Sequence, residues 1–220
     1  RQMCIRDRAA PSVTVVNSLG ELRSMTPDED GMDVKLMLNN AKITFSYTRP
    51  NGMQIATLED ETGAVEFGDV ASALKLSEAG VSLNGYINAT WYNYSGYNNL
   101  MSNDDTESSE IEKTTAEVMP LETTVADVQK QENVCRLVSF KDAEVVLDGN
   151  DELVLKQDDL SLNLVDMCKV FTGDDGEDVA PGKVLSLDGV LLYNAGDAEY
   201  DEPAYYYILP AKYEAAPSVT

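Results

Sequence analysis

The chain is 220 residues long, and 39 acidic residues against 16 basic ones give it a formal net charge of −23. A nucleic-acid-binding protein normally carries a row of Lys and Arg that displaces counterions from phosphates, and the sequence has no such row. Hydrophobic residues make up 43% of the sequence and charged residues 25%, so we expect a packed core rather than global disorder. The length suits one large domain or two domains of about 100 residues each.

Histidine is absent from the sequence, which removes the usual general base, every Ser-His or Cys-His pair and the commonest metal ligand. The three cysteines, Cys4, Cys135 and Cys168, form no C-x-x-C spacing, so no thiolate zinc motif is present. Cys135 and Cys168 lie in apolar runs and are expected to be small buried side chains, and whether they pair is left open. We therefore predict no catalytic residue, no metal ligand and no cofactor, and we expect the protein not to be an enzyme.

The first eight residues, RQMCIRDR, resemble translated adapter sequence more than protein, and the apolar segment of a signal peptide is missing. We expect the chain to begin inside a longer reading frame and assign residues 1–15 to a non-native leader and flexible start. The sequence has no run of 18 apolar residues, so we expect no membrane-spanning segment.

Residues 16–105 are predicted to form a first β-rich domain. Apolar and polar residues alternate over 34–45, and a slip at Asn39–Asn40 indicates a β-bulge in one long strand. The segment DVASALKLSEAG has an Asp cap and a closing glycine, which is typical of a short helix. In chain order the expected elements are strands at 34–45, 53–58 and 64–67, a helix at 69–80, and strands at 81–92 and from 98.

The tetrapeptide DETG, residues 60–63, lies between the second and third expected strands. This position predicts a hairpin turn, in which Gly63 supplies a positive φ. A calcium loop would place oxygen ligands at alternating positions of a D-x-D-x-D-G frame, which is missing here. We therefore interpret DETG as a turn and not as a metal site.

Residues 121–215 repeat the same order of signals as a second domain. Residues 41–43 align with 143–145 and Gly85 aligns with Gly189, at nearly the same separation in both copies. The polar, acidic residues 106–120 are predicted to be a linker, and 216–220 a tail. The elements expected in the second copy are strands at 137–147, 152–156 and 160–165, a short helix near 166–171, and strands at 183–193 and 204–211.

Three strands, a helix and two further strands form the element order of an OB-fold, a five-stranded Greek-key barrel. The sequence therefore predicts an all-β chain with short helices, built from two tandem five-stranded OB-fold-like barrels.

The stretches VKLMLNNAKIT, GMQIATLEDETGAVEF and GVSLNGYI, with CRLVSFKDAEV in the second copy, resemble the paired OB-like modules of Bacteroidota secreted and cell-surface proteins. The resemblance covers about residues 16–213 and rests on the strand starts, the D-x-T-G turn and the L-x-G of the fourth strand. It implies a secreted or cell-surface module of a larger protein, and it implies no catalytic residue.

OB barrels bind ligands on their second and third strands, flanked by the loops between strands one and two and between strands four and five. In the first copy these loops are aromatic, and rings beside amides can stack on sugars or bases. The same rings are also compatible with strand residues that pack into a core. In the second copy the loop at 194–203 is acidic, which indicates protein contact or spacing. The candidate ligand-binding residues are Tyr47, Arg49, Trp91, Tyr92, Tyr94 and Tyr97.

The function expected from the sequence is a non-catalytic binding module for a glycan or a protein. A single-stranded nucleic-acid-binding protein is the first alternative, suggested by the fold alone, although the net negative charge argues against it. A structural spacer domain is the second alternative. Whether the acidic group Asp174, Asp175, Glu177 and Asp178 binds calcium is left open, because its spacing matches no known cage.

Overall fold

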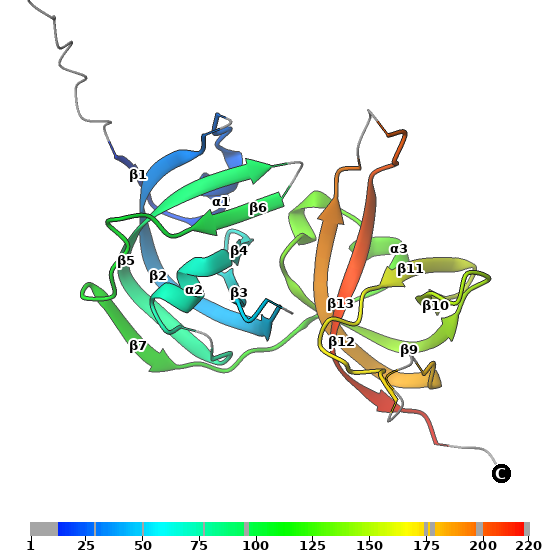
Figure 1. Ribbon diagram of the computed structural model, residues 1–220. Helices are drawn as coiled ribbons and strands as arrows, with labels where there is room; N and C mark the ends of the chain where they lie inside the picture. Colours follow the sequence, from blue (N-terminus) through cyan, green and yellow to red (C-terminus); the bar gives the residue numbers. More distant parts are fainter. Residues whose placement is uncertain are drawn as a thin grey trace, which may run out of the picture.

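The strands of the chain close into two five-stranded barrels that follow one another in the sequence (Figure 1). This computed structural model describes residues 13–217 except 29, 50, 77, 95–96, 174–175, 177–178 and 197–199, and only the backbone of 93, 94 and 97. Strands account for 53% of the structure and helices, all short, for 10%. The predicted fold, an all-β chain of two tandem OB-fold-like barrels, is therefore confirmed.

Barrel 1 closes in the strand order β2-β3-β4-β6-β5, with β5 paired back to β2. The pair β4 and β6 is parallel and the other neighbours are antiparallel, as the Greek-key order of an OB-fold requires. Its elements are β2 (Met32–Thr48), β3 (Gln54–Glu59), β4 (Ala64–Phe67), α2 (Gly68–Ala73), β5 (Val81–Tyr94) and β6 (Tyr97–Met101). A leader strand and helix precede them, β1 (Thr14–Val16) and α1 (Leu19–Ser24).

Barrel 2 closes in the equivalent order β9-β10-β11-β13-β12. Its strands are β9 (Leu137–Leu147), β10 (Leu153–Gln157), β11 (Leu160–Leu164), β12 (Gly182–Asn194) and β13 (Tyr205–Ala215). It also has a leader, made of β8 (Leu121–Thr123), α3 (Val125–Val128) and the 3-10 turn η1 (Gln131–Asn133). Both leader strands pair in parallel with the first strand of their barrel, so the duplicated unit includes the leader.

The helix expected near residues 166–171 does not form. The Asp166 carboxylate accepts hydrogen bonds from the backbone N–H groups of Val170 and Phe171, at 2.7 and 2.6 Å, and holds the segment in turns. An Asp side chain that bonds to nearby backbone in this way competes with helix formation.

The linker expected at residues 106–120 contains a strand, β7 (Ile111–Thr115), which pairs with the start of β5. The last part of β13 pairs with the start of β12 in the same way, so β6 and β7 correspond to one interrupted strand. The polar composition hid this strand, because β7 is exposed except for the half-buried Ile111. Residues 14 and 15, assigned to a flexible start, likewise lie in β1.

The bulge predicted at Asn39–Asn40 is confirmed. The register between β2 and β5 shifts between Leu38 and Ala41, and Asn40 has a φ of 52°. Asp142 in β9 has a φ of 51° at the equivalent position. Asn and Asp enter the left-handed region more readily than other residues with a side chain, which explains their use at both positions.

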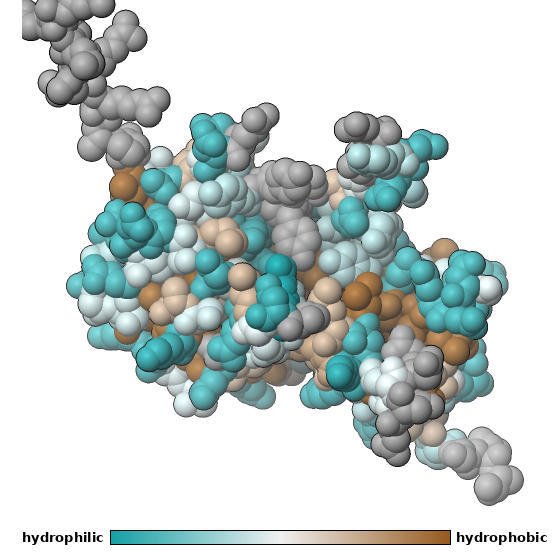
Figure 2. Space-filling view, viewed as in Figure 1, coloured by the Kyte–Doolittle hydropathy of each residue, from teal (hydrophilic) through white to brown (hydrophobic). Residues whose placement is uncertain are grey.

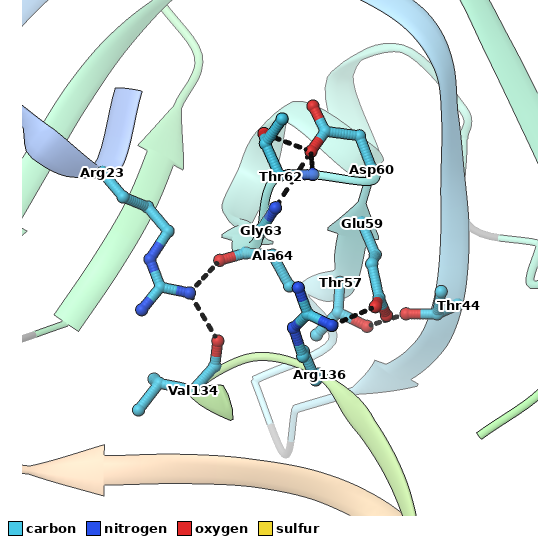
Figure 3. A network of polar contacts seen from close by, with 10 residues as sticks. All are labelled: Arg23, Thr44, Thr57, Glu59, Asp60, Thr62, Gly63, Ala64, Val134 and Arg136. Atoms are coloured by element: carbon cyan, nitrogen blue, oxygen red, sulfur yellow. Dashed lines mark hydrogen bonds and ion pairs between the residues drawn. The ribbon is translucent and has the colours of Figure 1, made fainter. Parts of the chain in front are cut away.

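The DETG turn docks helix α1 onto barrel 1 (Figure 3). Asp60 Oδ1 accepts hydrogen bonds from the Thr62 N–H and hydroxyl and from the Gly63 N–H, at 2.6 to 3.0 Å. Its Oδ2 accepts the Leu19 N–H at 2.9 Å, and Thr62 Oγ1 accepts the Gly20 N–H at 2.7 Å. The turn therefore satisfies two free N–H groups at the start of α1.

The prediction that Gly63 has a positive φ was wrong, because the φ of this glycine lies outside the left-handed region. A Cβ at Gly63 would lie 3.3 Å from Arg23 Cδ, so the small residue allows the close approach of α1. In barrel 2 the side chain of Gln157 replaces that of Asp60: its Oε1 accepts the Val125 N–H at 2.9 Å at the start of α3.

Replacement of Asp60 by Ala should lower the free energy of unfolding by about 1–3 kcal/mol, because buried N–H groups lose their acceptor. Chemical denaturation measures this loss. The matched control is Glu61→Ala, since the exposed Glu61 side chain makes no hydrogen bond to a described residue and should change stability by less than about 0.5 kcal/mol. Equal losses in the two variants would contradict the docking role of Asp60.

Candidate functional site

The two sides of β3 and β4 belong to different hydrophobic clusters. The side chains that point into barrel 1 from these strands pack in its own core: Ala56, Leu58, Val65 and Phe67. Ile55 and Ala64 point outward and are buried in the cluster formed by barrel 2, together with Phe45 and Tyr47 of β2. The face on which an OB-fold normally binds its ligand is therefore covered in barrel 1 by the second barrel.

Barrel 2 contributes an apolar outer patch to this contact. The strand registers place Val190 of β12 beside Leu137 of β9 and Leu209 of β13, on the side that faces away from the barrel interior. All three side chains are nevertheless buried and belong to the shared cluster. In the space-filling view the two barrels adjoin, and other hydrophobic residues are exposed on the surface of barrel 2 (Figure 2).

Two arginines add polar contacts across the interface (Figure 3). Arg23 of α1 donates to the carbonyls of Ala64 and Val134, each at 3.1 Å, and to that of Gln131. Arg136 forms an ion pair with Glu59, with Nη1 and Oε1 3.5 Å apart. Burial lowers the pKa of Arg23 and raises the pKa of Glu59, so both groups lose hydration at the contact.

Trp91 is not part of a surface ligand platform. Trp91 has 0% exposure in the barrel 1 core, so its ring cannot reach a ligand at the surface. Tyr92 is half-buried on the opposite side of β5, where a Cβ on Gly31 would lie 2.6 Å from its ring. Tyr94 and Tyr97 face one another in the register of β5 and β6, and their side chains lie outside the described part of the chain.

The other two candidates, Tyr47 and Arg49, lie at the edge of the barrel contact. Arg49 forms an ion pair at 3.0 Å with Glu66, whose side chain is only 1% exposed. Burial and the nearby Glu66 carboxylate raise the pKa of Tyr47 to about 12, while a hydrogen bond to Arg49 opposes that shift. Tyr47 is buried in the cluster shared with barrel 2, whereas the Arg49 ion pair lies within barrel 1.

The equivalent face of barrel 2 is partly exposed. A row of outward residues crosses the strands β9, β10, β11 and β13 in register: Val146, Val154, Asn163 and Tyr207. Asn163 is exposed beside the half-buried Tyr207, and Ser161 is exposed on the same side of β11. Tyr205, 42% exposed, lies with its ring centroid 5.9 Å from that of Tyr207. We call Ser161, Asn163, Tyr205 and Tyr207 the open face.

Substitutions in the second copy explain why the open face is not covered in the same way. The Glu59–Ala64 pair of barrel 1 corresponds in register to Lys156 and Ser161 in barrel 2. By the same alignment Ile55 corresponds to Glu152. The apolar residues that attach barrel 1 to its neighbour are therefore polar in barrel 2.

Carboxylates line the loops next to the open face. Asp148 accepts hydrogen bonds from the backbone of Asn150 and Glu152 at 2.8 and 3.0 Å, which lowers its pKa. Asp151 is exposed in the same loop between β9 and β10, and Asp201 and Glu202 are exposed in the loop between β12 and β13. This acidic rim would repel a phosphate backbone. The ligand-binding candidates predicted from the sequence all lie in barrel 1 and did not include the open face, because the acidic loop at 194–203 indicated protein contact or spacing in the second copy.

No disulfide joins Cys135 and Cys168, which are both free. Cys135 is buried as expected and Cys168 half-buried, and burial raises the pKa of both thiols. Within the described ranges no group of three or more Cys, Asp or Glu side chains is arranged to hold a metal. The acidic group Asp174, Asp175, Glu177 and Asp178 lies outside those ranges.

Comparison with known proteins gives no functional assignment: no protein-family model matches the sequence, and no curated protein matches it significantly. The described helices are all too short to cross a bilayer.

Replacement of Ile55 by Glu, the residue at the equivalent position of barrel 2, should separate the barrels because the contact would have to bury an unpaired charge. We expect a larger radius of gyration in X-ray scattering and two unfolding transitions. The control Glu152→Gln alters the exposed equivalent and should leave both measurements unchanged. An unchanged radius of gyration in a folded Ile55→Glu variant would contradict the proposed dependence on Ile55.

The raised pKa of Tyr47 predicts a loss of stability at high pH. As the pH rises from 10 towards 12, Tyr47 loses its proton in the unfolded state first, so the free energy of unfolding falls. The fall is complete above pH 12, where it amounts to about 3 kcal/mol. Tyr47→Phe should remove this part of the pH dependence in urea denaturation series run from pH 9 to 11. The exposed Tyr213→Phe serves as control, and identical pH profiles of wild type and Tyr47→Phe would refute the prediction.

Proposed function

We propose that the chain is a non-catalytic binding module that holds a glycan on the open face of barrel 2. The observation that carries this proposal is the contrast between two equivalent surfaces. The outward face of β3 and β4 is buried against barrel 2, whereas Ser161 and Asn163 on β11 remain exposed beside Tyr205.

The chemistry of the open face suits a sugar chain. The Tyr205 and Tyr207 rings offer apolar surface for the C–H faces of sugar rings, and the Asn163 amide and Ser161 hydroxyl can hydrogen-bond to ligand hydroxyls. Asn194 Nδ2 donates to the Tyr205 hydroxyl at 3.3 Å, which restrains the Tyr205 ring. A ring restrained before binding loses less conformational entropy when the ligand arrives.

Charge supports a glycan over single-stranded nucleic acid. The formal charge of −23 opposes a polyanion at long range, and Asp148, Asp151 and Glu202 oppose it next to the open face. The proposed setting, a secreted or cell-surface module within a larger Bacteroidota protein, rests on the sequence resemblance. No step of the proposal requires a catalytic residue or a cofactor.

Tyr205→Ala should weaken glycan binding at least tenfold, about 1.4 kcal/mol, because stacking on an aromatic ring contributes about 1–3 kcal/mol. The protein is first screened on a glycan array, and affinities are then measured by titration calorimetry. Tyr213→Ala is the matched control: Tyr213 is also on β13, is 39% exposed and also packs against another ring, that of Phe171.

Two further results would overturn the proposal. Micromolar, salt-sensitive binding of oligonucleotides at low salt, with no binding to the array, would assign the open face to nucleic acid. No binding in either assay would favour the structural spacer, for which the buried barrel contact already provides rigidity. Trp91→Ala would not distinguish glycan binding, nucleic-acid binding and a spacer role, because Trp91 is buried and its loss would destabilise barrel 1.

A further inference from the structure

Barrel 1 has a hollow of its own, separate from the open face of barrel 2. Its volume is about 390 Å³, and it lies between the β2 bulge, the DETG turn and the segment that connects the barrels. The wall residues used below are Asn39, Asn40, Lys42, Glu61, Val118 and Met119, and we call this cavity the barrel 1 hollow.

The frame of the hollow is rigid because its inner polar groups bond within the protein. Thr44 and Thr57 share a buried hydrogen bond at 2.9 Å, and four donors occupy the Asp60 carboxylate. Lys42 Nζ donates to the Glu117 carbonyl at 3.2 Å, which ties β2 to the connecting segment. Asn84 Oδ1 accepts the Asn40 backbone N–H at 2.9 Å and holds the bulge in place.

Three side chains at the edge of this frame retain their hydrogen-bonding capacity. Within the described chain the side-chain amides of Asn39 and Asn40 and the carboxylate of Glu61 have no hydrogen-bond partner. All three residues are exposed. The half-buried Val118 and Met119, which is 78% exposed, add apolar surface to the same hollow. The lining of the hollow therefore combines free side-chain amides with apolar surface.

The second copy shows which part of this arrangement comes from the fold. A hollow of about 370 Å³ lies at the same place in barrel 2, and its wall carries Asp142 where barrel 1 has Asn40. Lys156 and Lys183 also line it, so its surface is charged. The OB-like backbone thus makes a cavity twice, with charged and apolar residues in both linings. The amide of Gln157 in the second copy is hydrogen-bonded within the protein, whereas those of Asn39 and Asn40 in the first copy have no partner among the described residues.

We propose that the barrel 1 hollow binds a small, neutral, hydroxyl-rich ligand of the size of a monosaccharide or the terminal residue of a glycan. Amide groups both donate to and accept from hydroxyls, Glu61 accepts, and Met119 can contact the apolar side of a sugar ring. The volume lies within the usual range for small-molecule sites. Glu59 and Glu61 would repel a phosphate group. This site is independent of the function proposed for the open face.

The test is an NMR titration of the full chain, labelled with ¹⁵N, against glucose, galactose, mannose and N-acetylglucosamine. We expect at least one of these sugars to shift the amide signals of Asn39, Asn40 and Glu61. The double variant Asn39→Ala, Glu61→Ala should raise the dissociation constant at least tenfold. Asp142→Ala, Lys183→Ala alters the barrel 2 hollow as the matched control and should leave the constant unchanged.

The two binding sites can be told apart in the same experiment. Shifts at the barrel 1 hollow should persist in Tyr205→Ala, which tests the open face alone. The proposal would be overturned if none of the four sugars shifted the signals of the hollow at concentrations up to about 50 mM. Shifts confined to β11 and β13 would also overturn it. A double variant that keeps its spectrum and the wild-type affinity would also overturn it.

Discussion

Ile55 and Ala64 are apolar residues on the outer side of barrel 1, and a closed barrel cannot bury its own outer side chains. Barrel 2 covers them, and the same contact takes polar neighbours out of water. Each of these neighbours then needs a partner, and the structure supplies Thr44 for Thr57 and Arg49 for Glu66. The position of the two barrels, the loss of one OB ligand face and the polar contacts at its edge all follow from this burial.

The interface also depends on local structure far from its centre. Asp60 organises the DETG turn and receives the first N–H of α1, which orients the helix. Arg23 in the last turn of that helix then reaches the carbonyl of Val134 in the second unit. A turn with no metal and no catalytic role therefore helps to place one barrel on the other.

Duplication gave two surfaces with one backbone and different side chains. Where barrel 1 has Ala64 and Glu66 on its third strand, barrel 2 has Ser161 and Asn163 in the same register. A few outward positions thus change a protein contact into an exposed polar face, while the inward positions stay apolar to preserve the core. The two hollows differ by the same kind of exchange, since Asn40 of the first lining is Asp142 in the second and Glu59 is Lys156.

The sequence by itself determined the barrels, because period-two alternation and the order of strands and turns are local signals repeated in both copies. It did not reveal β7, whose residues are polar and owe their strand conformation to pairing with β5. Nor did it reveal the turns that replace a helix after Asp166. Alternation places neighbouring residues such as Trp91 and Tyr92 on opposite sides of a strand, but it does not say which side is core. Only the tertiary structure decided that Trp91 is buried in the core of barrel 1. It also decided that the face of β3 and β4 is covered, because burial of an outward residue depends on a partner surface about 80 residues away in the chain.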